Sequence, residues 1–156
     1  MNNYCDSAFN QIKIALESIK AIMECLCEED LTFKPTESKF SIGEILEHLS
    51  LICEADLLIA SGMSKEDMEK YYLENKLTSL AQMKLAINNS FSMLKRGYEN
   101  FSEEQLFEQI ESYWGTVYTR FEWLLEILSH IYHHRGQLHA ILVHVYRKEP
   151  LVALFE

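Results

Sequence analysis

Apolar residues recur at alternating three- and four-residue steps along the first part of the chain: Phe9, Ile12, Leu16, Ile19, Met23 and Leu26. That spacing places them in one stripe along an amphipathic helix, and we predict a helix over about residues 4–28. The polar stretch 32–39 contains Pro35, which lacks a backbone N–H and interrupts a helix. We therefore predict a loop there.

The motif Ser41-x-x-Glu44 marks the start of a second predicted helix. In such a capping box the serine hydroxyl accepts a hydrogen bond from a free backbone amide, while the glutamate carboxylate accepts one from the serine amide. One side of this helix then carries Ile45, Leu49, Ile52, Asp56 and Ile59. We expect the helix to end near Ser61 and Gly62.

A third helix is predicted after a charged stretch. Residues 63–76 show no sustained apolar period, so we predict a loop there with no more than a turn of helix. The candidate capping box Ser79-x-x-Gln82 then begins the helix. Its apolar side comprises Leu80, Met83, Ile87, Phe91, Leu94 and Tyr98.

The fourth predicted helix begins at Thr119-x-x-Glu122 and runs to about Arg147, with Pro150 beyond it as a stop. The connector at 99–116 has no pattern that predicts its structure, and no run in the chain shows the alternation of a β-strand. Four amphipathic helices of roughly 20–30 residues predict an all-α fold, an antiparallel four-helix bundle. We expect a single domain over residues 1–156.

Composition and charge exclude several classes of protein. Hydrophobic residues make up 48% of the chain, which supports a folded core and excludes a disordered chain. The formal net charge of −10 argues against nucleic acid as a partner, because binding to phosphates needs a basic surface. An acidic surface also fits anionic membranes poorly, and no stretch approaches the roughly 20 apolar residues of a membrane span.

The start of the chain and its cysteines indicate a cytoplasmic location. Residues 1–18 contain Asp6 and Glu17 and lack the basic and apolar regions of a secretory signal. The four cysteines form neither a C-x-x-C redox motif nor a paired zinc pattern. We therefore expect reduced thiols, buried as small apolar residues.

Three of the six histidines lie between residues 130 and 134. On the fourth predicted helix Glu126, His130, His134 and Gln137 form a short ladder at the margin of the apolar stripe. Two imidazoles at positions i and i+4 can bind one divalent cation, as in the H-E-x-x-H motif of zinc proteases. Here Ile131 follows the first histidine, so that position supplies no protease base.

A catalytic zinc site needs three protein ligands, and His48 is the candidate third ligand. It borders the apolar stripe of the second helix, whereas His139 projects about 180° from His130. His144 lies roughly 15 Å beyond the histidine pair, at about 1.5 Å per helical residue. Without a metal ion, three neutral imidazoles in an apolar wall would need three separate hydrogen-bond partners, whereas one ion satisfies a nitrogen of each.

Neighbouring residues leave alternatives open. Glu126 is either a hydrogen-bond partner for His130 or a solvated side chain. Gln137 either orients a ligand or a metal-bound water, or is a buried amide between helices. Trp123 either lines a pocket or packs in the core. Gly136 costs about 1 kcal/mol within a helix, so we expect a close helix approach there.

A diiron site of the ferritin type is the competing metal site in a helical bundle. That site requires Glu-x-x-His pairs on two helices together with further glutamates. The chain offers Glu44-x-x-x-His48 and Glu126-x-x-x-His130, each one residue too long. The spacing therefore favours the three-histidine site.

The chain resembles a known family at these residues. The run 130–137, His-Ile-Tyr-His-His-Arg-Gly-Gln, is similar to the H-x-x-x-H-R-G-Q signature of the DinB/YfiT-like metalloenzymes. The segment 41–49 resembles that family's s-x-x-E-x-L-x-H-L motif, although Phe40 precedes it where the family often has tryptophan. The resemblance implies a four-helix bundle, often dimeric, with a divalent metal ion, commonly zinc or nickel, bound by His48, His130 and His134.

The same resemblance implies two chemistries. In one, the metal activates a low-molecular-weight thiol for transfer to an electrophile, as in the bacillithiol- and mycothiol-dependent S-transferases. In the other, a metal hydroxide performs hydrolysis. Thiol transfer is the preferred hypothesis, because the sequence shows no general base for hydrolysis. The contrasting hypothesis is a non-catalytic bundle, metal-binding or metal-free, that acts in stress response or as a binding module. The expected partners are a small-molecule substrate and a second copy in a homodimer.

Overall fold

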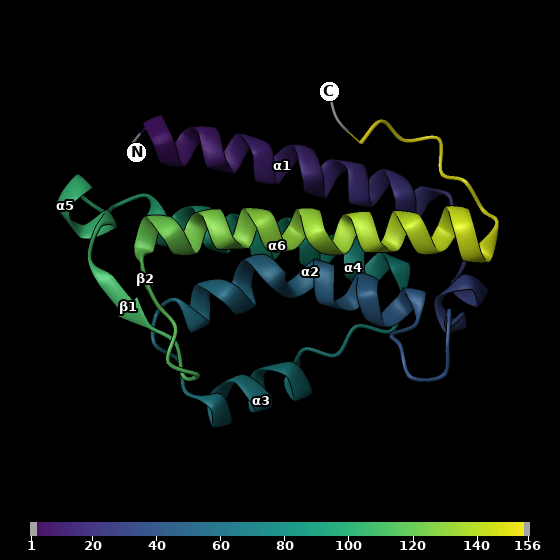
Figure 1. Ribbon diagram of the computed structural model, residues 1–156, viewed down its shortest axis with the longest axis horizontal. Helices are drawn as coiled ribbons and strands as arrows, with labels where there is room; N and C mark the ends of the chain where they lie inside the picture. Colours follow the sequence, from purple (N-terminus) through teal and green to yellow (C-terminus); the bar gives the residue numbers. More distant parts are fainter. Residues whose placement is uncertain (1–2, 155–156) are drawn as a thin grey trace.

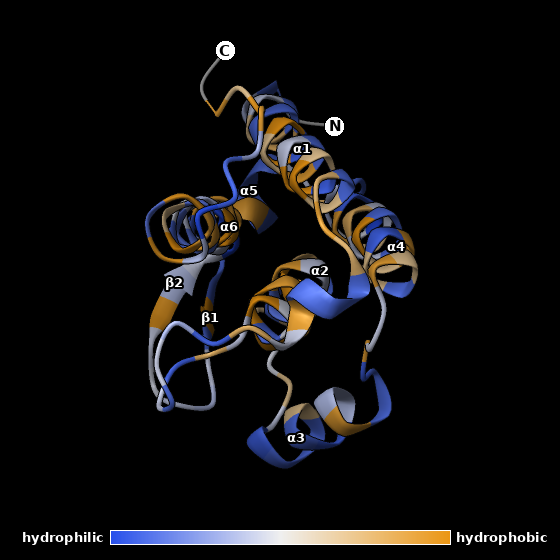
Figure 2. Ribbon diagram, turned by 90° about the vertical axis from the view of Figure 1, so that its right-hand side faces the viewer, coloured by the Kyte–Doolittle hydropathy of each residue, from blue (hydrophilic) through white to orange (hydrophobic). Residues whose placement is uncertain are grey.

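The structure, a computed structural model, describes residues 3–154. Within that range four long helices, α1 (Asn3–Glu24), α2 (Ile42–Ile59), α4 (Leu80–Tyr98) and α6 (Arg120–Ala140), pack into a bundle (Figure 1). Figure 2, an end-on view, shows these four helices around a common interior with α3 outside them beside α2. The predicted all-α bundle is confirmed.

The predicted apolar stripes form the interior of the bundle. Ile12 and Ile19 on α1, Ile52 on α2, Ile87 on α4 and Ile127 on α6 are all 0–1% exposed and belong to one hydrophobic core. Burial of such side chains is the main favourable contribution to folding. In residues 3–154 no helix combines the length and apolarity needed to cross a lipid bilayer.

Polar side chains define where the long helices begin. The hydroxyl of Ser41 accepts a hydrogen bond from the amide of Glu44, whose carboxylate accepts one from the amide of Ser41, so this capping box is confirmed. Thr119 caps α6 by the same reciprocal pattern. The hydroxyl of Ser79 caps α4 by accepting from the amide of Gln82. The side chain of Gln82 accepts from the amide of Thr78 and not from that of Ser79, so the predicted capping box is only half formed.

The predicted loop at 63–76 was wrong, because a ten-residue helix, α3 (Lys65–Glu74), lies there. The hydroxyl of Ser64 caps it, and Met68 is its one buried side chain. Met68 packs with Trp123 and with residues of α2 in a second, smaller apolar cluster. A helix this short is marginal by itself, so contacts with the bundle stabilise it. Those contacts use only one face of α3.

The connector before α6 contains a short helix, α5 (Glu103–Leu106), and a β-hairpin. Strands β1 (Gln109–Glu111) and β2 (Val117–Thr119) pair antiparallel, so the expectation of no strand was wrong. Gly115 in the intervening turn has φ +88°, a conformation that glycine adopts without strain. Strands of three residues are too short to show a clear alternation in the sequence.

The first helix ends earlier than its periodicity predicts, whereas the last ends at the predicted place. α1 ends at Glu24 and is followed by a 3-10 helix, η1 (Glu28–Thr32), on which α2 packs closely. A Cβ on Gly43 would lie 2.9 Å from the carbonyl oxygen of Leu31, so this approach requires glycine. α6 continues as a π-helix, η2 (Ile141–Tyr146), and stops at Arg147, whose φ is +63°.

The buried carboxylate of Asp30 joins η1 to the end of η2. It accepts hydrogen bonds from the hydroxyl of Tyr146, from Lys148 Nζ (2.6 Å) and from the backbone amide of Cys27 (2.8 Å). Burial raises the pKa of this carboxyl, but the hydrogen bonds outweigh burial and hold the pKa well below its usual range. The ionised carboxylate therefore holds the two segments together.

Asp30→Asn is expected to lower the free energy of unfolding by about 2 kcal/mol, because hydrogen bonds to a charged group contribute about 1.5–3 kcal/mol. The folded-state pKa of Asp30 lies below the unfolded value of about 3.9, so its stabilisation is present above that pH and is lost as the pH falls further. Urea denaturation from pH 7 to pH 3 should show the advantage of wild type over the variant shrink below about pH 4. Glu37→Gln, at an exposed carboxylate, is the control. An Asp30→Asn protein as stable as wild type at pH 7 would contradict this role.

Candidate metal centre

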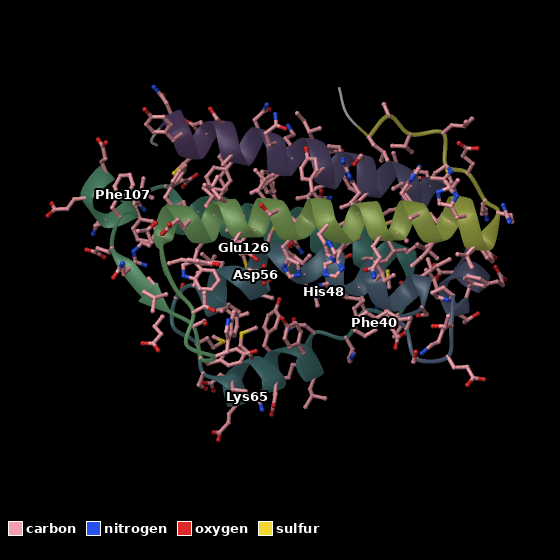
Figure 3. The ribbon with its side chains drawn as sticks, in the orientation of Figure 1. Phe40, His48, Asp56, Lys65, Phe107 and Glu126 are labelled. Atoms are coloured by element: carbon pink, nitrogen blue, oxygen red, sulfur yellow. The ribbon has the colours of Figure 1, made fainter. Side chains whose placement is uncertain are left out.

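Three histidines from two helices meet on one side of the bundle. His48 on α2 and His130 and His134 on α6 each offer a ring nitrogen, and the three nitrogens lie within 4.8 Å of one another. Figure 3 shows His48 and Asp56 on α2 below α6, on the side of the bundle where α3 lies. The three side chains are half-buried. The structure thus brings together the three residues that the sequence singled out.

The spacing of the imidazoles fits one shared cation. His48 Nε2 lies 3.1 Å from His130 Nε2. Zinc binds histidine nitrogen at about 2.0–2.1 Å, so two ligands of a tetrahedral ion lie about 3.3–3.4 Å apart. The ring centroid of His134 lies 4.6 Å from that of His48 and 4.8 Å from that of His130. Donor type and spacing therefore both suit zinc or a similar divalent ion.

Asp56 fixes the orientation of His130. His130 Nδ1 lies 2.8 Å from a carboxylate oxygen of Asp56, and the N–H donor there leaves Nε2 with its lone pair facing His48. Metal-binding histidines usually donate their second ring nitrogen to such an acceptor. Glu126, one candidate for this role, is exposed, and the hydrogen bond goes to Asp56.

Asp56 is the functional residue that sequence reasoning missed. Its signal was an acidic side chain within the apolar side of α2, two helical turns after His48. The side chain is only 13% exposed, and a carboxylate is rarely buried to that extent without a partner. The pattern identifies a partnered carboxylate, but only the fold identifies His130 as its partner.

Gln137 fixes the orientation of His134 in the same way. Its side-chain oxygen lies 3.0 Å from His134 Nδ1 and accepts the N–H, which leaves Nε2 for a ligand interaction. Gln137 is exposed, so it is not a buried amide between helices. Gly136 beside it has no neighbour within 4 Å of an added Cβ, so the predicted close helix approach was wrong.

Burial and charge give the three imidazoles different proton affinities. Burial lowers the pKa of His48 to about 4, and the two other histidines add to the effect. Burial also lowers the pKa of His134, against the opposing hydrogen bond to Gln137. The hydrogen bond to Asp56 raises the pKa of His130. His48 is therefore uncharged at neutral pH, the form in which imidazole binds a metal.

The other candidates have structural positions. Trp123 is 3% exposed, donates its Nε1–H to the carbonyl of Ile110 and packs edge-to-face on Tyr118 and Trp114, which agrees with the core alternative. Arg135 is buried and donates to the hydroxyl of Ser18 on α1. The remaining described histidines, His133, His139 and His144, are not part of the three-nitrogen group.

Comparison with known proteins identifies relatives of this chain. The family model of the DinB superfamily matches residues 11–138. A search of curated proteins gave no match. The solved structure of a protein from Exiguobacterium sibiricum, assigned to the DinB family, is 26% identical, with a TM-score of 0.83 over 99% of both chains.

Two further solved structures share the fold at lower identity. A DinB-like protein from Bacillus subtilis is 18% identical, with a TM-score of 0.67 over 97% of this chain and 96% of its own. A DinB-like protein from Bacillus cereus is 14% identical, with a TM-score of 0.70 over 97% of this chain and 95% of its own. At these identities the likeness concerns the fold alone.

Asp56→Asn is expected to weaken binding of Zn²⁺ by about 10–100-fold, the usual cost of removing a hydrogen-bond partner of a metal-binding histidine. Competition with a chromogenic chelator at pH 7.5 measures the affinity, and thermal unfolding of the metal-free proteins checks that the fold is kept. Glu126→Gln removes an exposed carboxylate from the same region and is the control. Equal zinc affinities for wild type and Asp56→Asn would contradict the orienting role.

Proposed function

The chain belongs to the DinB superfamily, and we propose that it binds one divalent metal ion, zinc or nickel, through His48, His130 and His134. We propose further that it is an enzyme, in which this site activates a low-molecular-weight thiol for transfer to an electrophilic small molecule. The observation that carries the proposal is the convergence of three ring nitrogens within 4.8 Å, two of them on imidazoles whose Nδ1 atoms are held by other side chains.

The arrangement of the protein groups supports an open site. Three histidine ligands leave one position of a tetrahedral ion for a substrate. A divalent ion there would stabilise a thiolate at neutral pH and so supply the nucleophile. Asp56 and Gln137 each accept a hydrogen bond from the Nδ1 of one imidazole, which leaves Nε2 of that ring free for a metal. Each of the three ligands keeps part of its surface exposed to solvent, as an open site requires.

The same geometry favours thiol transfer over hydrolysis. Hydrolysis is aided by a positioned general base that takes a proton from water. Asp56, the carboxylate that contacts the histidines, is engaged by His130 Nδ1. Glu126 is exposed on α6. A thiol has a lower pKa than water and needs less assistance once a cation is close.

Protein purified without added metal is expected to contain about one equivalent of zinc or nickel by elemental analysis, because three converging imidazoles, two of them preoriented, bind such ions tightly. His48→Ala and His134→Ala should each lose the metal while keeping a helical circular dichroism spectrum. His139→Ala, on the same helix as His134 but outside the group, is the control. A wild-type protein with no metal, and with no rise in thermal stability on adding Zn²⁺ or Ni²⁺, would overturn the proposed site.

The metal-loaded protein is expected to accelerate the reaction of a small thiol with a chromogenic electrophile such as 1-chloro-2,4-dinitrobenzene. A panel of thiols measures this, with the His134→Ala protein as the blank for the uncatalysed reaction. Turnover in wild type that is absent in the variant and after chelation supports the thiol-transfer enzyme. Tight metal binding with no turnover of any thiol would favour the non-catalytic binding bundle instead.

A further inference from the structure

A cavity of about 270 Å³ opens directly beside His48. Its lining residues are Phe40, Glu44, Glu47, His48, Leu51, Tyr72 and Lys76. We call it the Phe40–Tyr72 cavity. Four of the lining residues stand at positions i, i+3, i+4 and i+7 of α2, so one face of that helix forms both the cavity wall and a ligand of the candidate metal centre.

The position of this cavity distinguishes it from a larger one. A cavity of about 520 Å³ lies between α1 and residues 152–154 and contains none of the three histidines. The Phe40–Tyr72 cavity has His48 in its wall, so it adjoins the three-histidine group through this one residue. Contact with a candidate metal ligand makes the smaller cavity the relevant one.

The side walls of the cavity are apolar and aromatic. Phe40 is 57% exposed, Leu51 is buried, and Tyr72 contributes a half-buried ring from α3. An aromatic ring left exposed beside a cavity gains stability when an apolar group covers it. Two aromatic side chains in the wall also favour a flat occupant, which can stack or meet them edge-on.

The charged residues in the cavity wall have partners within the protein. Glu44 accepts from the amide of Ser41 and pairs with Lys34 at 3.2 Å. Glu47 accepts from the amide of Leu77 and lies 3.6 Å from Lys76. The contacts of Glu44 stabilise the start of α2, and those of Glu47 hold the segment that follows α3. The apolar surface is what the cavity offers to a ligand.

Tyr72 gives the cavity an uncharged wall. Burial, and then the negative charge of Asp56, raises the pKa of Tyr72 to about 12, so the phenol remains neutral. A group in the cavity therefore meets an uncharged aromatic ring at Tyr72.

We propose that the Phe40–Tyr72 cavity binds a small apolar, ring-sized group of the substrate whose reacting atom lies at the three-histidine site. The inference rests on the proposed function, since it assigns a substrate class to the same site. The volume lies below the roughly 300–1,000 Å³ of drug-sized sites, so the group is about one ring in size. Phe40 is then the specificity-determining residue, because its ring is the most exposed aromatic part of the wall.

The test uses two thiols and the cobalt(II)-substituted protein. Benzyl mercaptan carries one ring, and 2-mercaptoethanol carries none; thiolate binding is measured by the sulfur-to-cobalt absorption. Phe40→Ala is expected to weaken benzyl mercaptan binding about ten-fold and to leave 2-mercaptoethanol unchanged, because the variant removes only apolar contact. The metal content should not change.

Phe107→Ala is the matched control. Phe107 is 61% exposed, close to the value for Phe40, and lies beyond α5, far from His48 (Figure 3). This variant should leave the affinities of both thiols at the wild-type values. Equal losses of both thiols in Phe40→Ala, or no loss of benzyl mercaptan, would overturn the cavity proposal and leave the metal site standing.

A second measurement is independent of metal and thiol. Benzyl alcohol titrated into the metal-free protein should shift the NMR signals of the Leu51 methyl groups through the ring current, while the methyls of Leu125 on α6 stay unchanged. Phe40→Ala should weaken this effect. Shifts at Leu51 without any thiol binding to the cobalt protein would support the cavity and overturn thiol activation. No shift at Leu51 up to the solubility limit would overturn the cavity.

Discussion

The packing of α2 against α6 is the constraint on which the candidate site depends. The apolar faces of both helices lie in one close-packed core, with Ile52 and Ile127 each 0% exposed. A packed interior does not allow helices to slide without opening voids. The 3.1 Å separation of His48 and His130 is therefore set by the helix core. A metal site requires that stability, since bond lengths to its ligands vary little.

Electrostatics then decides how the three imidazoles can act. In half-buried surroundings a protonated imidazole is costly, and three together repel one another, so His48 stays neutral. Asp56 and Gln137 accept hydrogen bonds from the Nδ1–H groups of His130 and His134. The Nε2 lone pairs of these two rings then face the site. The negative charge of Asp56 would also offset part of a divalent cation's charge. The carboxylate of Asp56 thus orients His130 and also favours binding of the cation.

The sequence predicted the long elements and failed on the short ones for a common reason. A helix of about 20 residues repeats its buried face five or six times, and that repetition is visible in the chain. In α3 only Met68 is fully buried, and each strand of the hairpin has three residues, so neither repeats a pattern. Contacts with α2 and with Trp123 stabilise α3, and such contacts leave no local periodic signal.

By itself the sequence determined the bundle, the caps at Ser41 and Thr119, and the pairing of His130 with His134, because each follows from the local geometry of a helix. The sequence also named His48 as a candidate third ligand, but only the tertiary structure set its 3.1 Å contact with His130 and made Asp56, in place of Glu126, the partner of His130. Those relations depend on the rotation and offset of one helix against another. Side-chain packing in the core decides both, and no single segment of the sequence encodes them.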